Sequence, residues 1–159
     1  MSDAPEERPL LLVCSCGGHL LQLLALQEAW RPFPHTWVTL DRSDARSLLE
    51  GEDVQWAFGP TNRSIKNLFR NLALARRVLR DTRPFAVLTT GAGVAVPFAW
   101  LARFYGARVV YVESVTRIER LSLSGRLIHP VASRMYVQWP ELAEPVIGAR
   151  YRGTVLSAP

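Results

Sequence analysis

Residues 10–26 read LLLVCSCGGHLLQLLAL, and the rest of the chain is organised around them. A short apolar run, two glycines and a series of strong helix formers indicate a buried strand, a tight turn and a buried helix. Gly17 and Gly18 permit the sharp turn and uncover the first amides of the helix, where an anion such as phosphate binds well. His19 then places an imidazole beside that anion.

The same turn has a second interpretation, because many α/β proteins use strand, glycine turn and helix for packing alone. The dinucleotide fingerprint G-x-G-x-x-G is incomplete here, since residues 19–21 stand where it would continue. The loop by itself leaves function and plain architecture open.

Length and composition bound the class of protein. With 159 residues, 48% of them hydrophobic and 21% charged, we expect one soluble domain over residues 1–159, with residues 1–8 disordered. No run reaches the roughly 18 apolar residues of a membrane span, and the polar start is no signal peptide, which predicts a cytoplasmic chain. Cys14 and Cys16 suit free thiols. No further ligands cluster near His19, so we expect no metal site.

Strand and helix signals alternate along the chain, which predicts a Rossmann-like parallel sheet flanked by helices. The first helix after the opening unit takes its cap from Ser43 or Asp44, and the long one from Thr61 or Asn62. Further strands are expected at 36–40, 54–58, 85–90, 108–112 and 135–139, with an edge strand or linker in 151–155, and helices at about 43–49, 61–80, 94–102 and 126–132.

The predicted helix 61–80 carries a cationic stripe within a chain of net charge +5. Either this face is merely solvated or it lies on an anionic membrane surface, which we favour because compensating acids are scarce. Nucleic acid is not expected, since no aromatic stacking series accompanies the stripe. On a 3.6-residue period the stripe comprises Arg63, Lys66, Arg70, Arg77 and Arg80, and the opposite, buried face comprises Leu68, Leu72, Ala75 and Leu79.

A second glycine turn follows another predicted strand. Thr90, Gly91 and Gly93 stand at its carboxyl end, and the strand at 108–112 delivers Glu113 and Ser114 to the same edge. Ligands of parallel sheets bind along this edge, so the two turns together favour a real site.

The ordered set of motifs resembles a known family. The motifs are Gly17-Gly18-His19, Thr90-Gly91-Ala92-Gly93 with Pro97, Glu113-Ser114 with Arg117, Leu121 to Gly125, Gln138-Trp139 and Tyr151-Arg152-Gly153. Across residues 9–156 they look like the acceptor-side, membrane-recruiting subunit of split GT-B glycosyltransferases, which builds dolichol-linked oligosaccharide in eukaryotes and occurs in bacterial exopolysaccharide and capsule clusters. More distantly, the chain is similar to the amino-terminal half of the transferase that glycosylates the peptidoglycan lipid precursor.

The resemblance implies half of an inverting glycosyltransferase, inactive alone. This half would bind a polyprenyl-diphosphate-linked sugar acceptor at the inner face of the plasma membrane, while a separate donor-binding subunit holds the UDP-sugar. No other cofactor and no metal are implied. The chain departs from the family pattern at Cys16, where Ser, Thr or Gly is expected, and shows no amino-terminal hydrophobic anchor, so membrane attachment would come through the surface or a partner.

The resemblance also implies roles for single residues. His19 or Glu113 would be the catalytic base, although His19 is equally suited to orient the loop and Glu113 to pair with Arg117. An apolar surface around Trp139, Leu142 and Ile147 is expected to dock the partner. The acceptor and its diphosphate would be held by Gly17, Gly18, Thr90, Gly91, Gly93, Ser114 and Arg117.

Two other functions stay open at this point. The chain is either a non-catalytic scaffold that recruits a complete transferase to the membrane, or a Rossmann enzyme that binds NAD or S-adenosylmethionine. The scaffold predicts that His19 and Glu113 are dispensable for the activity of the complex. The Rossmann enzyme predicts that the chain alone binds its cofactor.

Overall fold

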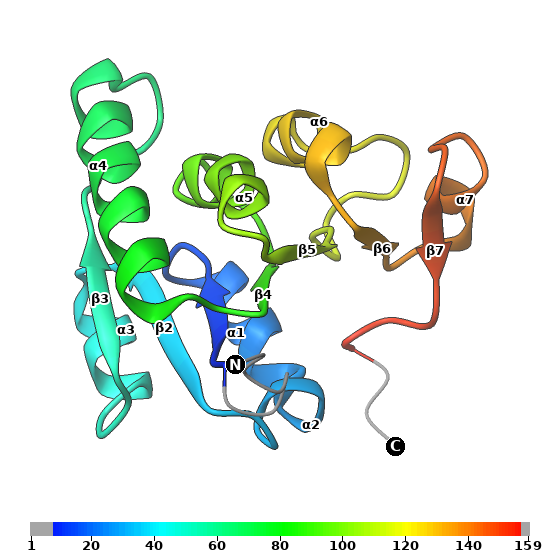
Figure 1. The fold of residues 1–159 in the computed structure, drawn as a ribbon. Helices are drawn as coiled ribbons and strands as arrows, with labels where there is room; N and C mark the ends of the chain where they lie inside the picture. The colour runs from blue at the N-terminus through cyan, green and yellow to red at the C-terminus, as the bar shows by residue number, and fades with distance from the viewer. Residues whose placement is uncertain (1–7, 157–159) are drawn as a thin grey trace.

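Seven parallel strands form one sheet in the computed structural model, which describes residues 8–156 (Figure 1). The strand order is β3-β2-β1-β4-β5-β6-β7, so the chain winds outward from β1 in both directions. The predicted parallel sheet is confirmed, and an edge strand does form near the carboxyl end, at Ala149–Tyr151 instead of within 151–155. The strands are β1 (Leu10–Val13), β2 (His35–Leu40), β3 (Val54–Ala57), β4 (Ala86–Thr89), β5 (Arg108–Val112), β6 (Arg134–Val137) and β7 (Ala149–Tyr151).

Helices cover both faces of the sheet, as the ribbon shows (Figure 1). One layer holds the three helices nearest the amino terminus, and the other holds α4, α5 and α6. The helices are α1 (Gly18–Ala25), α2 (Gln27–Trp30), α3 (Ser43–Leu48), α4 (Ile65–Thr82), α5 (Ala95–Phe104), α6 (Leu123–Ile128), the 3-10 turn η1 (His129–Val131) and α7 (Pro140–Ala143).

Strand β1 is buried on both faces, which explains its unbroken apolar run. Leu11 and Val13 pack into the cluster beneath α4 and α5, and Leu10 and Leu12 pack into the cluster beneath α1 and α2. Cys14 continues β1 as a free thiol, and burial raises its pKa to about 12.

Helix α4 begins later than predicted. Ala75 and Leu79 are buried as predicted, but the inward face of the first turns differs from the prediction. Its cap is Ser64, whose Oγ accepts the Asn67 amide at 3.3 Å, and Arg63 precedes the helix with a φ of 54°. Asn67 and Asn71 are buried because their amides bond the backbone of the preceding loop, at Pro60 and Phe58. Leu68 and Leu72, predicted to be buried, are therefore 49% and 38% exposed.

Two shorter helices also differ from the prediction. The residue before α3 is Arg42, and neither Ser43 nor Asp44 caps it, because the Asp44 carboxylate bonds elsewhere. Helix α6 begins at Leu123 instead of 126, since the Ser122 hydroxyl accepts the Gly125 amide at 3.0 Å.

At the amino terminus, the predicted disorder of residues 1–8 concerns residues that mostly lie outside the described range. Arg8 is described, and its guanidinium donates to the carbonyls of Arg83 and Pro84 at 2.9 and 2.7 Å.

Candidate functional site

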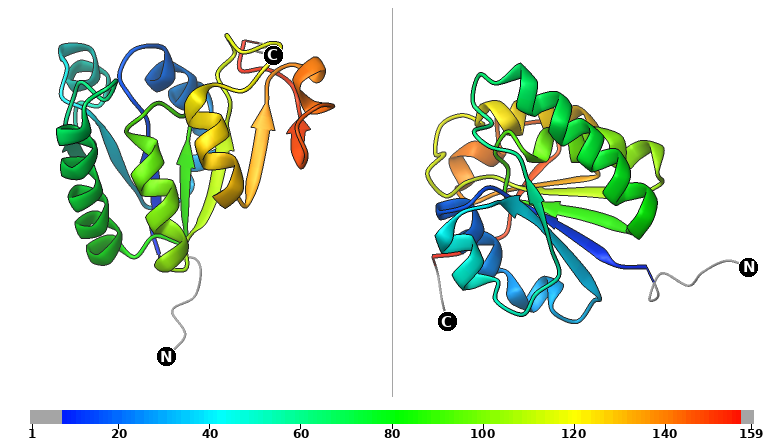
Figure 2. Two further views of the ribbon diagram at one scale, coloured as in Figure 1. Left: turned by 90° about the horizontal axis from the view of Figure 1, so that it is seen from above. Right: turned by 90° about the vertical axis from the view of Figure 1, so that its left-hand side faces the viewer.

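The winding direction of the chain reverses between β1 and β4, which are hydrogen-bonded neighbours. The helices that follow them, α1 and α5, lie on opposite faces of the sheet (Figure 1). In the left view of Figure 2 the strands point upward, so their carboxyl ends and the loops after them gather along the upper edge. Such a switch point is where ligands of open α/β sheets bind.

His19 and Thr90 join the two glycine turns across this switch point. The Thr90 hydroxyl donates to the His19 carbonyl at 2.8 Å, and His19 Nδ1 lies 2.8 Å from the Thr90 carbonyl oxygen. A carbonyl only accepts hydrogen bonds, so Nδ1 carries the proton and Nε2 of the neutral ring keeps its lone pair. His19 is half-buried, and its ring is prepared to take a proton at Nε2.

The first glycine turn differs from the prediction in one respect. The Gly17 amide is not open to an anion, because it donates to Asp44 Oδ2 at 2.9 Å. Gly17 itself has a φ of 71°, which favours glycine, and no side chain caps the start of α1. The amides of Gly18 and His19 are the ones left for a ligand.

The second glycine turn is also partly occupied. The Gly91 amide donates to Thr89 Oγ1 at 2.9 Å, and the Ala92 amide donates to Ser124 Oγ at 3.2 Å. Gly93 packs against Thr61 of the loop before α4. No side chain caps α5, so an anion at this turn would meet the amides of Gly93 and Val94.

Glu113 is the largest departure from the predicted site. Its side chain is fully buried, and each carboxylate oxygen accepts two hydrogen bonds. The donors are the Tyr111 hydroxyl, the Ser114 amide, and the amide and hydroxyl of Ser122, at 2.8 to 3.1 Å. The Glu113 carboxylate is thus enclosed by these donors, which do not include Arg117, and its role as the base stays a prediction.

Tyr111 of β5, two residues before Glu113, completes this buried cluster. Burial, together with the adjacent Glu113 carboxylate, raises the pKa of its hydroxyl, which stays protonated and donates to Glu113. Ser122 Oγ also lies 3.1 Å from Ser124 Oγ, and Ser124 accepts the Ala92 amide. The cluster thus ties the loop after β5 to the second glycine turn.

We expect Gly125→Ala to destabilise the fold by about 1–3 kcal/mol, because an added Cβ would collide with Glu113 Oε2 and lie 3.2 Å from the hydroxyls of Ser122 and Tyr111. Gly18→Ala is the matched control, since a Cβ there meets nothing within 4 Å. Urea unfolding of both variants checks this, and equal stabilities would contradict the packing described.

Ser114 and Arg117 share the loop after β5 but not the same exposure. Ser114 is buried, and its hydroxyl lies 2.9 Å from that of Thr116 within the loop. Arg117 is exposed and lines a shallow hollow with Arg120. Arg117 is therefore the more accessible of the two, and the contact of each with an acceptor stays a prediction.

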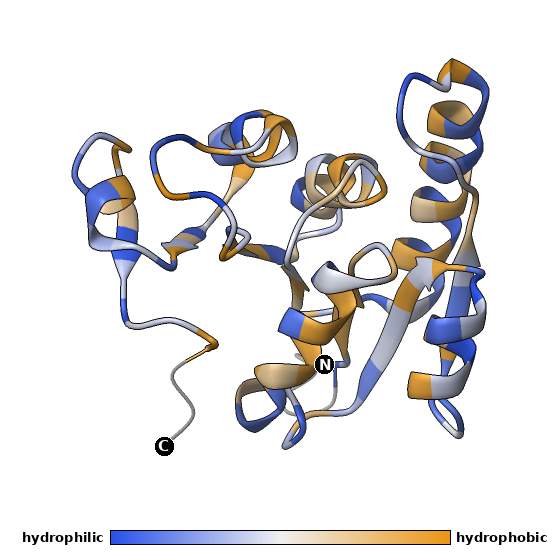
Figure 3. Ribbon diagram, turned by 180° about the vertical axis from the view of Figure 1, so that it is seen from behind, coloured by the Kyte–Doolittle hydropathy of each residue, from blue (hydrophilic) through white to orange (hydrophobic). Residues whose placement is uncertain are grey.

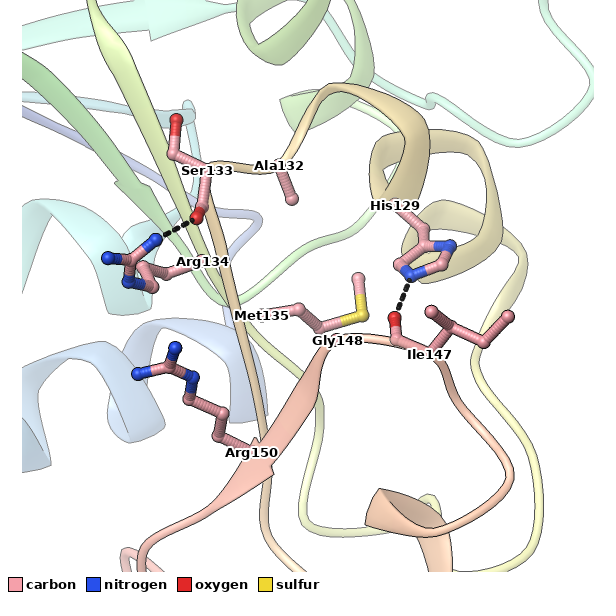
Figure 4. Close-up of a pocket in the computed structure, with 8 residues that line it drawn as sticks. All are labelled: His129, Ala132, Ser133, Arg134, Met135, Ile147, Gly148 and Arg150. Carbon is pink, nitrogen blue, oxygen red and sulfur yellow. Dashed lines mark hydrogen bonds between the residues drawn. The ribbon is translucent and has the colours of Figure 1, made fainter.

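The predicted docking residues do not form one surface. Leu142 is fully buried in the core, and the Trp139 indole donates to the Val115 carbonyl at 2.6 Å. Ile147 is 89% exposed and lines a pocket at the amino ends of β6 and β7, with His129 bonded to its carbonyl (Figure 4). This pocket lies at the opposite edge of the sheet from His19.

Two buried glutamines escaped the sequence analysis as site residues. Gln22 of α1 and Gln138 after β6 hydrogen-bond each other at 2.8 Å, and both bond the backbone of the loop after β5. A polar residue within the leucine run of residues 20–26 was the one available signal for Gln22.

Within residues 8–156, no three His, Cys, Asp or Glu side chains gather as metal ligands would. In the same part of the chain, no helix has both the length and the apolarity needed to cross a membrane.

Solved structures resemble the fold over about half of their own length. Acinetobacter baumannii MurG matches with a TM-score of 0.71 and 18% identity, over 90% of this chain and 45% of that one. A UDP-N-acetylglucosamine 2-epimerase from Rickettsia bellii matches with a TM-score of 0.75 and 13% identity, over 94% and 45%. At these identities the likeness establishes the Rossmann-like fold.

Three curated relatives from different organisms carry the same name. A "UDP-N-acetylglucosamine transferase subunit ALG14" from Eremothecium gossypii is 40% identical over 102 residues, covering 60% of this chain and 45% of that relative. Relatives of the same name from Debaryomyces hansenii and Homo sapiens are 28% and 25% identical and cover 98% and 95% of this chain, and 81% and 84% of their own. The family model "Oligosaccharide biosynthesis protein Alg14 like" matches residues 58–155, and since this is more than half of the chain, the protein belongs to the Alg14-like family.

Proposed function

We propose that this protein is the acceptor-binding subunit of a two-component inverting glycosyltransferase. A donor-binding subunit holds a UDP-sugar and faces the carboxyl edge of the sheet, and the acceptor is a sugar linked to a polyprenyl diphosphate. The proposal follows the family and the printed name of its relatives, which are subunits of a UDP-N-acetylglucosamine transferase. The likeness to MurG covers 45% of that longer chain, which agrees with a fold that forms one part of a larger enzyme.

His19 carries the chemical part of the proposal. With its proton held at Nδ1 by the Thr90 carbonyl, Nε2 accepts the proton of an acceptor hydroxyl. The hydroxyl oxygen then bonds to the anomeric carbon of the UDP-sugar as the bond to UDP breaks on the opposite side, which inverts the configuration. Glu113 is too deeply buried to share this role.

The diphosphate of the acceptor binds between the two helix starts and Arg117. The amides of Gly18 and His19, and those of Gly93 and Val94, are the uncapped donors at this edge. Asp44 places a carboxylate at the Gly17 amide, which repels a second anion there. The diphosphate is therefore displaced from Gly17 toward the second turn and Arg117.

In this proposal the outer face of α4 is the surface that contacts the membrane. Ile65, Leu68 and Phe69 are 72%, 49% and 65% exposed at the end of α4 nearest the site, and Lys66 stands among them. Figure 3 shows apolar and hydrophilic bands alternating along this helix. Apolar side chains among cations suit the interface of an anionic bilayer, such as the inner face of the plasma membrane.

The five predicted cations contribute unequally to this face. Arg80 pairs with Asp81 at 2.8 Å, and the Arg70 guanidinium lies 3.8 Å from the centre of the Phe58 ring. Lys66 and Arg77 are exposed on the helix, and Arg63 is exposed just before it.

We expect Phe69→Ser to weaken binding to anionic vesicles by about thirtyfold, because an aromatic side chain buried in the bilayer interface contributes about 2 kcal/mol. Phe104→Ser is the control, since Phe104 is 82% exposed at the far end of α5. Co-sedimentation with vesicles of phosphatidylglycerol and phosphatidylcholine measures both. Equal binding by the two variants would place the membrane surface elsewhere.

Transfer of radiolabelled sugar from UDP-sugars to polyprenyl-diphosphate-linked acceptors tests the whole proposal. The assay uses this chain alone, the donor-binding subunit alone and the mixture. Activity in the mixture only is the expected result. Full activity of the donor-binding subunit alone would make this chain a scaffold and overturn the shared active site.

A further inference from the structure

The loop after β5 is held from beneath by two buried side-chain amides. Gln138 is 2% exposed and Gln22 is 9% exposed, and Gln138 Nε2 donates to Gln22 Oε1 at 2.8 Å. The Val115 amide donates to the same Gln22 oxygen at 2.9 Å, and Gln138 Nε2 donates to the Glu113 carbonyl at 2.9 Å. Two points of the loop thus rest on one amide pair.

The orientation of both amides is determined by backbone groups. The Val115 N–H only donates, so the Gln22 oxygen must face it, and the Glu113 carbonyl only accepts, so the Gln138 nitrogen must face it. Gln138 Oε1 then accepts the Val155 amide at 2.9 Å and the Thr154 hydroxyl at 3.2 Å. All four hydrogen-bonding positions of the Gln138 amide are used, and turning either amide over would break several bonds at once.

This network joins the elements that surround the switch point. Gln22 also donates to the Gly18 carbonyl at 3.2 Å, in the first turn of α1, next to His19. Through Gln138 the tail at residues 154–155 reaches the same network. In the left view of Figure 2 the loop after β5 and the red tail lie together at the upper edge of the sheet.

The structure assigns Gln22 and Gln138 as positioning residues, which fix the loop carrying Arg117 relative to the turn carrying His19. Neither side chain contacts the substrates, and this assignment rests on the proposed function. The Arg117 amide donates to the Ser114 carbonyl at 3.0 Å, so the arginine follows the segment that the two glutamines hold. Loosening that segment separates the anion-binding Arg117 from the base, and acceptor binding suffers while donor binding does not.

Methionine replacements test the assignment, because methionine keeps the length and approximate volume of glutamine and forms none of its hydrogen bonds. We expect Gln22→Met and Gln138→Met each to raise the KM for the acceptor about tenfold in the two-subunit assay, with the KM for the UDP-sugar unchanged. The double variant is expected to do no more than the worse single variant, since both changes break one shared link. Gln55→Met, on β3 at the far edge of the sheet, is the control.

Amide hydrogen exchange on the chain alone separates this inference from the proposed function. Exchange at Val115 is expected to accelerate at least about tenfold in both glutamine variants and to stay unchanged in Gln55→Met. Faster exchange with no transfer by the wild-type mixture would refute the proposed function and leave the packing role intact. Unchanged exchange, an unchanged acceptor KM or equal changes in both KM values would overturn the assignment. If Gln138→Met does not fold, the Val115 exchange rate and the two KM values of Gln22→Met test the assignment in its place.

Discussion

Replacing His19 by alanine lowers kcat of the two-subunit transferase by about 10²–10⁴, the range in which a positioned general base contributes. The Thr90 carbonyl holds the proton at Nδ1, so alanine removes the proton acceptor that Nε2 provides at this edge. The acceptor KM changes little, because the helix amides and Arg117 remain. Steady-state kinetics of the two-subunit assay measure kcat and the acceptor KM.

His129→Ala is the matched control for the His19 variant. His129 bonds the Ile147 carbonyl at the opposite edge of the sheet, so its loss leaves kcat unchanged. A His19→Ala enzyme with a wild-type kcat would show that the imidazole only orients the loop.

Replacing Glu113 by alanine lowers the free energy of unfolding by roughly 3 kcal/mol or more. The change removes the acceptor of the Ser114 and Ser122 amides and one of the partners of the Tyr111 and Ser122 hydroxyls, and it leaves a cavity where the carboxylate was. Glu113→Gln keeps one carbonyl oxygen and is expected to cost about half as much. Urea unfolding of the isolated chain measures the loss.

Glu119→Ala provides the comparison for Glu113, since it removes an exposed carboxylate from the same loop and stays within about 0.5 kcal/mol of the wild type. A Glu113→Gln variant of nearly wild-type stability whose complex has lost its activity would contradict a purely structural carboxylate and return it to the reaction.

Local sequence signals were sufficient for the fold because each element carries its own pattern. The four apolar residues of β1 need burial on both faces, and a strand that is covered on both faces belongs to a parallel sheet between helix layers. The two glycine turns then predicted that a ligand binds at the carboxyl edge of the sheet. The family resemblance rested on the order of the motifs, and the match over residues 58–155 confirms it.

Polar side chains limited the prediction of helix faces. In α4 the period of 3.6 residues was right, but Asn67 and Asn71 occupy the inward face that Leu68 and Leu72 were predicted to fill. Hydropathy assigns asparagine to solvent, whereas here its amide satisfies backbone groups of the preceding loop. The sequence does not show which backbone groups these amides bond, because that depends on the position of the loop in the folded chain.

From the sequence alone, the parallel sheet, the glycine turns at its carboxyl edge and His19 at the first turn could be determined. These depend on residues close together in the chain. Only the tertiary structure decided that Asp44 occupies the Gly17 amide, that Glu113 is buried, and that Gln22 meets Gln138 across 116 positions. The first and the last rest on hydrogen bonds between distant segments, whereas the burial of Glu113 rests on donors within nine residues that the loop after β5 folds back onto it. A carboxylate or amide becomes a ligand group or a structural one according to which donors the fold brings to it.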